Sequence, residues 1–565
     1  MKFEHFVALL MVLTGFCSFG YELVLHYEAV LIVGSSTLTM GIIISMFIFG
    51  YLSSFYFGRL VDKMRNPRKI VTLFVILEVC IALLLLIIVP VTRMVPSISE
   101  LLGWVIGFHL IDDYYLLIIT ISLLALVIPL LMGGEIPIAM KLISLRRHTG
   151  TSEIGRISGL VFAMDSLGAG IGGIVTSVFL IPSLGQTSTS ILLGAISLST
   201  ALLMILSYTF YTSGIGKGLE RGVDKAFKKE AELRERSFIK SLGRILLEYK
   251  LALVAIFIGI IIIASMYVNI EQIEHSTIQQ NYDDPVVYYK YSRYQQIVIV
   301  ENPDLGYMMY LNGQLQIAEE DEYQYHEALV HIPMITHPQP RNILIIGGGD
   351  GGALEEVLKH DCVEKVVLVE LDSEVVTVSR IYFNSVVKDA FDDPKVTIEY
   401  EDGRRYVEDY DGDPFDVAII DLPDPETETV ASLYTKEYYQ SVEDVMSEDG
   451  IMVTQSTSPF EYGEVSMSIL KTAEEVFEVT DIYSSYVYSF GPWSFVIGSN
   501  ELDPVTLDPQ YINGTVENRT LTELNLYSAS THYGFFDLME NEEMERAYEK
   551  ATVSTKDRPV IQKRF

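Results

Sequence analysis

The sequence predicts a chain of two parts: an α-helical multi-pass membrane domain of about seven transmembrane helices, then a Rossmann-like α/β domain preceded by a small β-hairpin subdomain. Long apolar runs fill the first half of the 565 residues, whereas the second half contains a buried strand, a glycine-rich turn and a helix in succession. Charge divides the chain at the same place, because residues 269–565 carry 57 acidic and 19 basic side chains. We therefore expect a lipid-facing part and an acidic, water-facing part.

Seven apolar stretches are long enough to cross a bilayer, which takes about 20 residues. The basic residues gather in alternate loops, at 59–69, 141–156 and 217–250, which places the N-terminus in the cytoplasm and, with seven spans, the second half outside the cell membrane. A weaker apolar segment, 101–110, would reverse that result if it also crossed. The predicted spans are 6–32, 36–57, 70–90, 114–132, 158–181, 187–208 and 251–268.

The composition limits the partners and cofactors. The formal net charge of −34 disfavours nucleic acid, whose phosphates need Lys and Arg, and favours polycations. The three cysteines, Cys17, Cys80 and Cys362, have no zinc-ligand spacing, so no metal site is predicted.

The second half opens with a β pattern. Residues 296–301 and 307–311 flank a turn and predict a hairpin, and residues 321–337 predict a helix. A buried strand then runs into Gly347-Gly-Gly-Asp-Gly-Gly352 and a helix, the opening of a nucleotide-binding α/β fold. This glycine loop fits an NAD, flavin or S-adenosyl ligand.

Acidic residues end the predicted strands. Parallel strands bring their carboxyl ends to one sheet edge, where ligands bind. So many carboxylates in one cleft need a compensating cation, and an organic polycation fits better than a metal because metal-ligand His or Cys spacing is lacking. An acid inside the loop, Asp350, would repel a pyrophosphate and argues against NAD and FAD. The residues expected at this edge are Asp350, Glu370, Asp402, Asp421 and Asp424.

Over about residues 280–500 the chain resembles the polyamine aminopropyltransferase (spermidine synthase) family, and the apolar half resembles the multi-pass variant of that family. The order and spacing of several short motifs carry the resemblance. They are Tyr294-Gln295, Leu311-Asn-Gly-Gln-Leu-Gln316, Asp321-Glu-Tyr-Gln-Tyr-His-Glu327, Gly347-Gly-Gly-Asp-Gly-Gly352, Val369-Glu-Leu-Asp372, Asp402-Gly403 and Asp421-x-x-Asp424-Pro.

The resemblance implies a Rossmann-like S-adenosyl-type transferase. An amine would attack the aminopropyl carbon of decarboxylated S-adenosylmethionine and release methylthioadenosine, with no cofactor and no metal. A homodimer or homotetramer is also implied. By family matching, Asp421 is the general base; Gln295, Glu370, Asp402, Gly403 and Asp350 bind the donor; and Tyr325, His326, Asp350, Asp424, Gln316 and Gln455 bind the amine, with Tyr488 matched loosely.

Two departures from the family pattern concern loops. Asn312 replaces the usual acid before a glycine, and Glu428 stands where a nucleoside-contacting proline is expected. The second loop shapes the amine pocket, so an acceptor other than putrescine is an alternative.

Other functions stay open from the sequence. Glu22, Glu135 and Asp165 lie in or beside apolar spans and fit a cation pathway, or else interfacial positions and pairing with Lys141 or Arg156. A membrane polyamine transporter or sensor with a non-catalytic synthase-like domain is the main alternative, and a methyltransferase is a further one.

The expected domain boundaries follow from these patterns. They are a membrane domain at 1–213, a charged amphipathic linker at 214–250, a seventh span at 251–268, a hairpin subdomain with its helix at 273–335, the Rossmann-like aminopropyltransferase domain at 336–510 and a C-terminal extension at 511–565.

Overall fold

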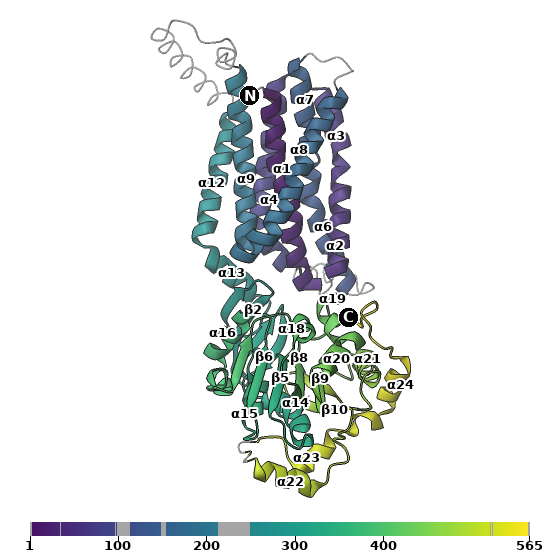
Figure 1. The fold of residues 1–565 in the computed structure, drawn as a ribbon. Coiled ribbons are helices and arrows are strands. Elements are labelled where there is room, and N and C mark those ends of the chain that lie inside the picture. Colours follow the sequence, from purple (N-terminus) through teal and green to yellow (C-terminus); the bar gives the residue numbers. More distant parts are fainter. Residues whose placement is uncertain are drawn as a thin grey trace. The chain divides into compact units, whose positions relative to one another are not determined.

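The structure is a computed structural model that divides into two compact units, Met1–Asn281 and Tyr282–Phe565 (Figure 1). The weak apolar segment 101–110 and nearly all of the linker 214–250 lie outside the described residues. Those residues are 3–33, 36–96, 98, 113–147, 154–212, 249–519, 521 and 524–562.

The first unit is built from helices, and six helical stretches in its described part are long and apolar enough to cross a membrane. They are Phe3–Val33, Leu38–Asp62, Pro67–Arg93, Tyr115–Leu145, Gly155–Tyr211 and Lys250–Val268. The individual helices are α1 (Phe3–Val33), α2 (Ser36–Tyr51), α3 (Ser53–Asp62), α4 (Pro67–Arg93), α6 (Asp113–Met132), α7 (Glu135–Arg147), α8 (Ile154–Val175), the π-helix η2 (Thr176–Leu180), α9 (Ile181–Thr212), α12 (Lys250–Val268) and α13 (Ile270–Gln279).

The stretch Gly155–Tyr211 reverses direction, which is why six stretches stand against seven predicted spans. Gly185 interrupts α9 with φ 76° and ψ 172°, a conformation open to glycine. Gly168 and Gly172 of α8 lie against Val12 and Phe16, so α8 runs in the same direction as α1. In α9, Leu193 lies beside Gly20 and the ring of Tyr211 lies 5.5 Å from that of Phe3, so α9 runs back along α1. The two halves of this stretch therefore run along α1 in opposite directions.

The second unit begins with an antiparallel sheet of four strands. The predicted hairpin is its centre, β2 (Gln296–Asn302) and β3 (Gly306–Leu311), while β1 (Val286–Tyr291) and β4 (Gln314–Ala318) extend it on either side. The turn into β4 needs a left-handed residue. Asn312 has φ 51° and its side-chain oxygen accepts a hydrogen bond from Gln296 N at 3.0 Å, which accounts for asparagine there.

A seven-stranded sheet follows in the order β10-β11-β9-β8-β5-β6-β7. The strands β5 to β9 are parallel, and β10 and β11 add an antiparallel edge. The order reverses between β5 and β8, so a ligand crevice is expected at their carboxyl ends. The strands are β5 (Asn342–Gly347), β6 (Lys365–Val369), β7 (Val396–Glu399), β8 (Phe415–Asp421), β9 (Met446–Gln455), β10 (Val479–Val487) and β11 (Gly491–Ser499).

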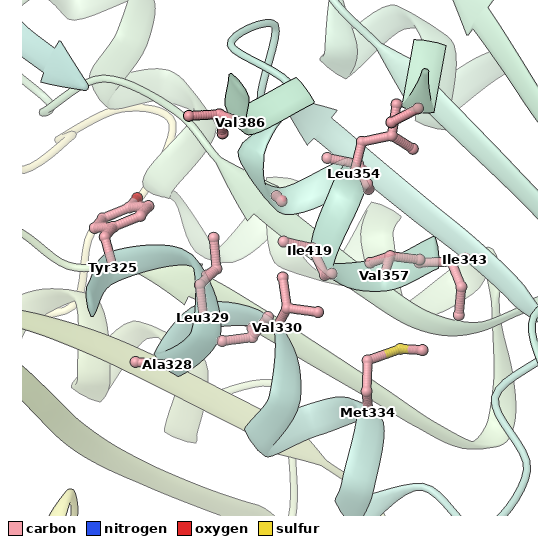
Figure 2. Close-up of a cluster of buried hydrophobic side chains, with 14 of the residues drawn as sticks. Tyr325, Ala328, Leu329, Val330, Met334, Ile343, Leu354, Val357, Val386 and Ile419 are labelled. Atoms are coloured by element: carbon pink, nitrogen blue, oxygen red, sulfur yellow. The ribbon is translucent and has the colours of Figure 1, made fainter. Parts of the chain in front are cut away.

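Helix α14 (Tyr323–Thr336) packs its buried residues on this sheet and on α15 (Gly352–Leu358), as Figure 2 shows for Leu329, Val330 and Ile419. This packing fixes the start of α14 against the glycine loop. The remaining helices of the unit are α16 (Ser373–Tyr382), α17 (Asn384–Val387), η3 (Ala390–Asp392), α18 (Gly403–Asp409), α19 (Glu428–Ala431), η4 (Ser432–Tyr434), α20 (Lys436–Asp444), α21 (Gly463–Glu474), α22 (Pro509–Asn518), α23 (Ala529–Gly534), η5 (Asp537–Glu540) and α24 (Glu542–Lys550).

The C-terminal extension packs on the same unit. Glu327 on α14 accepts hydrogen bonds from the backbone N–H groups of Asn525, Leu526 and Tyr527. After α24 the chain returns to the sheet edge, where Gln562 N donates to Pro425 O at 2.9 Å. The end of the extension therefore lies beside the strand ends.

Candidate active site

The glycine loop brings backbone into direct contact with the end of β8. Gly348 N donates to Asp421 O at 3.0 Å, and Gly347 and Gly348 have φ 82° and 64°. A Cβ on Gly347 would lie 1.9 Å from Asp421 O, and one on Gly352 would lie 2.3 Å from the ring of His326. Glycine is therefore required at these positions because a side chain would displace the acidic and imidazole groups of the site.

Asp421 is the last residue of β8, and its two carboxylate oxygens have different surroundings. Its Oδ1 accepts a hydrogen bond from Tyr325 Oη at 2.8 Å, while Oδ2 is buried without a partner among the described residues. Burial, followed by the charge of Asp350, raises the pKa of Asp421 to about 6. The carboxylate is thus ionised at neutral pH, and one oxygen remains available to accept a proton.

His326 links two acids beside Asp421. Its Nδ1 lies 2.7 Å from Glu322 Oε2 and its Nε2 lies 3.4 Å from Asp350 Oδ1. Burial opposes the charged imidazolium, but the hydrogen bonds to the two carboxylates raise the pKa of His326 well above its ordinary value. Burial likewise opposes ionisation of Asp350, but His326 and Gly352 N hold the pKa of Asp350 below its usual range. An ionised Asp350 therefore lies beside Asp421.

A further acidic residue, Glu370, lies against the glycine loop. Glu370 follows β6, its Oε1 accepts from Asp372 N at 2.8 Å, and burial raises its pKa to about 7. A Cβ on Gly349 would come within 2.6 Å of Glu370 Oε2, so the Glu370 carboxylate lies against the loop. Gln295 Nε2 donates to Asp372 Oδ2 at 3.1 Å. These contacts bring Gln295 and Glu370 to one region.

Asp402 and Gly403 follow β7. Asp402 caps α18, with its Oδ1 accepting from Arg404 N at 3.0 Å and Arg405 N at 3.3 Å. Gly403 packs on β5, where a Cβ would lie 2.5 Å from Ile346. The structure thus shows a capping role for Asp402.

Asp424 lies in a network that sequence reasoning found only in part. The predicted Gln455 donates to Asp424 Oδ1 at 3.4 Å and also to Tyr434 Oη at 2.6 Å. The unpredicted Gln562 and Thr457 donate to Asp424 Oδ2 at 2.8 and 3.3 Å. Burial raises the pKa of Asp424 to about 6.

No local signal marks the missed residues. Gln562 is 138 residues from Asp424 in a segment without a motif. Thr457 has φ 62°, an uncommon conformation for a β-branched residue and one that often marks functional sites. Only the folded chain reveals either residue.

Two candidate residues make their contacts outside this network. Gln316 Nε2 donates to the backbone of Gln314 and Leu315, on its own strand. Tyr488 is 66% exposed, and its N–H donates to Gln324 Oε1 at 2.8 Å. Glu428, the departure noted above, is the first residue of the short helix α19.

Three side chains of this cluster could provide ligands to a metal ion. One atom each from His326, Asp350 and Asp421 lie within 4.8 Å of one another, close enough to bind one ion. However, both ring nitrogens of His326 face carboxylates, and an imidazolium has no free lone pair for a metal. The group fits an organic ammonium, which donates hydrogen bonds to carboxylates, better than a metal ion.

Together these features define an α/β transferase domain with an acidic pocket at the switch point of its sheet. Residues 322–509 match the family model described as the spermine/spermidine synthase domain, and residues 274–319 match the spermidine synthase tetramerisation domain. The polyamine aminopropyltransferase 1 of Streptomyces coelicolor is 30% identical over 514 residues, covering 89% of this chain and 86% of the relative. The chain therefore belongs to the polyamine aminopropyltransferase family, as the sequence motifs predicted.

Shorter relatives match the second unit alone. The polyamine aminopropyltransferase of Thermotoga neapolitana is 39% identical over 257 residues, which cover 45% of this chain and 84% of the relative. A crystal structure of a spermidine synthase in complex with the transition-state analogue AdoDATO is 36% identical and covers 46% of this chain and 88% of that chain, with a TM-score of 0.43.

Proposed function

We propose that this protein transfers an aminopropyl group from decarboxylated S-adenosylmethionine to an amine acceptor, putrescine giving spermidine or a related amine, and releases methylthioadenosine. The observation that carries this assignment is the ionisable Asp421, which has one oxygen without a partner in the described chain and lies beside Asp350 at the carboxyl edge of the sheet. Membership of the family supports the reaction, and the reaction needs no cofactor. The full-length match favours this enzyme over a non-catalytic sensor or a methyltransferase.

The donor would bind on the side of the glycine loop. We propose that Glu370 accepts hydrogen bonds from the ribose and that Gln295, Asp402 and Gly403 bind the nucleoside, with Asp402 turned toward adenine. Asp350 would pair with the ammonium of the aminopropyl group. The same carboxylate would repel the extra carboxylate of S-adenosylmethionine, which supports selection of the decarboxylated donor.

The acceptor would react at Asp421. The amine nitrogen attacks the aminopropyl carbon next to the sulfonium, the C–S bond breaks, and its electron pair goes to sulfur. The proton released from nitrogen passes to Asp421 Oδ2, while Tyr325 holds Oδ1. An amine with a pKa near 10.4 is mostly protonated at neutral pH, so a carboxylate that orients it and accepts its proton accelerates the step.

The far amine of the acceptor would bind at Asp424. We propose that Gln455 and Gln562 orient this carboxylate, because both donate to it, and that Tyr325 and His326 line the approach. Gln316 is proposed as an amine-binding residue only because it matches a family position. Replacing Gln316 should change amine binding little, because its side chain donates to the backbone of its own strand. Glu428 departs from the family pattern in the loop that shapes the amine pocket. We therefore propose that the acceptor is either putrescine or another linear amine.

Product analysis tests the proposal. Purified full-length protein is incubated with decarboxylated S-adenosylmethionine and a panel of linear amines, and the products are identified by mass. We expect methylthioadenosine together with an amine heavier by one aminopropyl group. Methyl transfer, or binding without product, would contradict the assignment.

We further propose that the first unit spans the membrane, because its helices have the required length and hydropathy. The reversal at Gly185 supports counting Gly155–Tyr211 as two crossings, and hence seven in all. The distribution of Lys and Arg supports a cytoplasmic N-terminus and an external catalytic domain. We propose the domain boundaries given by the sequence together with this arrangement, and the match at 274–319 supports a homo-oligomer.

A further inference from the structure

Helix α1 carries a polar face inside the first unit. Thr14, Ser18 and Glu22 are spaced four residues apart, so they lie on the same side of the helix. They are only 3%, 2% and 6% exposed. Thr14 Oγ1 donates to Asp165 Oδ1 of α8 at 3.3 Å, and Glu135 of α7 lies close enough to Asp165 for their charges to interact. The face therefore joins carboxylates from three helices.

Two further residues extend the group. Tyr51, at the end of α2, lies close enough to Glu22, Glu135 and Asp165 for their charges to interact. Glu78 of α4 interacts in the same way with Glu135 and accepts a hydrogen bond from Ser197 of α9. We call Glu22, Glu78, Glu135 and Asp165 the acidic row.

Glu135 occupies a special backbone position. Helix α6 ends at Met132 and α7 begins at Glu135, so the intervening glycines interrupt the apolar stretch Tyr115–Leu145. Gly133 packs on Gly50 and Ser53, and a Cβ on Gly134 would lie 2.7 Å from Leu77, the neighbour of Glu78. Broken helices of this kind occur where membrane proteins bind charged ligands. The break places Glu135 next to Glu78.

The acidic row has unused hydrogen-bonding capacity. Among the described residues, Glu22 Oε1 and Glu78 Oε1 are buried without a partner, and their side chains belong to residues only 6% and 2% exposed. Pairing of the row with Lys141, an alternative from the sequence, is wrong because Lys141 pairs with Asp62 at 3.2 Å. Arg93 is likewise engaged, by Glu28 at 2.7 Å. A buried polar oxygen without a partner is costly, so these oxygens point to a ligand that donates hydrogen bonds to carboxyl groups, as an ammonium does.

The extent of the row indicates the kind of cation. The positions from Thr14 to Glu22 cover about 12 Å of α1, at 1.5 Å per residue. A single metal ion gathers its oxygen ligands within about 2.6 Å, so it cannot reach both ends. A linear amine with two or more ammonium groups can, and hydroxyls such as those of Thr14, Ser18 and Tyr51 accept hydrogen bonds from it.

We propose that the acidic row is a second binding site of this protein, for a protonated linear polyamine, separate from the catalytic pocket. The choice of polyamine rests on the proposed function, in which the catalytic unit consumes and makes this class of molecule. The first unit would then bind the same cations that the second unit processes.

Binding stoichiometry tests the proposal. Full-length protein in nanodiscs of zwitterionic phosphatidylcholine is equilibrated with radiolabelled spermidine, and the number of sites per chain is measured. We expect two classes of site in the wild type, and a loss of one class, or at least tenfold weaker binding at it, in Glu22→Gln and in Asp165→Asn. Asp62→Asn is the matched control, because it removes an exposed carboxylate of the same unit.

Turnover on the same samples separates the two proposals. Glu22→Gln and Asp165→Asn should retain wild-type methylthioadenosine release, which also shows that they are folded; if one variant is not recovered, the other decides. Two classes of site in both variants, loss of a class in Asp62→Asn as well, or one class only in the wild type would overturn the acidic row as a polyamine site. Failure of the enzymatic proposal would appear instead as wild-type protein without turnover.

Discussion

The two units of this protein both bury several carboxylates, but they treat them differently. In the catalytic unit, Asp350 accepts hydrogen bonds from His326 and Gly352, and Asp424 accepts them from Gln455, Thr457 and Gln562. In the helical unit, Glu22 and Glu78 each keep a buried oxygen without a partner in the described part of the chain.

The difference shows what each arrangement can do. A pocket whose acids are fixed by protein donors holds its geometry before the substrate arrives, as catalysis requires. Asp421 Oδ2 is the exception within that pocket, and it lies where the proposed reaction needs a proton acceptor. A row of less constrained acids is suited to binding a flexible cation but not to chemistry on it.

The largest effect should come from Asp421→Asn. The amide keeps the shape of the side chain but cannot accept a proton, so we expect kcat for methylthioadenosine release to fall by about 10²–10⁴-fold, the usual contribution of a general base. Asp411→Asn, an exposed site in the turn before β8, is the control and should leave kcat unchanged. Full activity in Asp421→Asn would show that Asp421 is not the general base. The proposed functional difference between the acids of the two units would then also be wrong.

The pH profile should report the same carboxylate. The pKa of Asp421 is about 6 and that of Asp424 is about 6, so both are ionised above that pH and become protonated below it. We expect kcat/KM to fall below pH 6 with a slope that approaches about tenfold per pH unit, because a protonated Asp421 cannot accept the amine proton, and more steeply if protonation of Asp424 also weakens amine binding. Steady-state rates from pH 5 to 8, with enzyme stability checked at each pH, would measure this. A flat acid limb would show that neither group titrates in the reaction.

The acids of the catalytic unit could be predicted from the sequence more completely than those of the helical unit. The glycine loop, the acids after β6 and β8 and the helix holding Tyr325 and His326 could be predicted, because local motifs and parallel-strand topology determine where they lie. Gln562 could not, since its contact with Asp424 spans 138 residues and depends on how the extension packs. The acidic row was likewise predicted only in part: Glu78 gave no signal, because its proximity to Glu135 depends on helix packing and on the break before α7.

The acceptor side of the pocket should show intermediate effects. Gln562→Ala removes a donor at 2.8 Å from Asp424, and one hydrogen bond to a charged group contributes about 1.5–3 kcal/mol at most. We therefore expect the amine KM to rise by no more than about 10- to 150-fold, with kcat and the donor KM nearly unchanged. Asp424→Asn should raise the amine KM further. Gln510→Ala, in the exposed first turn of α22, is a matched control. If Gln562→Ala raised the donor KM as much as the amine KM, the proposal that Gln562 acts on amine binding through Asp424 would be wrong.

The smallest expected effect concerns stability. The substitution Asp421→Asn, which should lower activity, should make the protein more stable. Because the folded-state pKa of Asp421 is about 6, above its ordinary value of 3.8, its contribution to stability is present below pH 4 and is lost as the pH rises through 6. The ionised carboxylate therefore destabilises the catalytic unit at pH 8. Asp421→Asn should raise the melting temperature by a few °C at pH 8, and the gain should shrink at pH 5. Thermal unfolding of both proteins at the two pH values measures this, with Asp411→Asn expected to show no pH-dependent gain. A pH-independent shift would mean that the free oxygen of Asp421 is stabilised by a contact that the geometry of the pocket does not show.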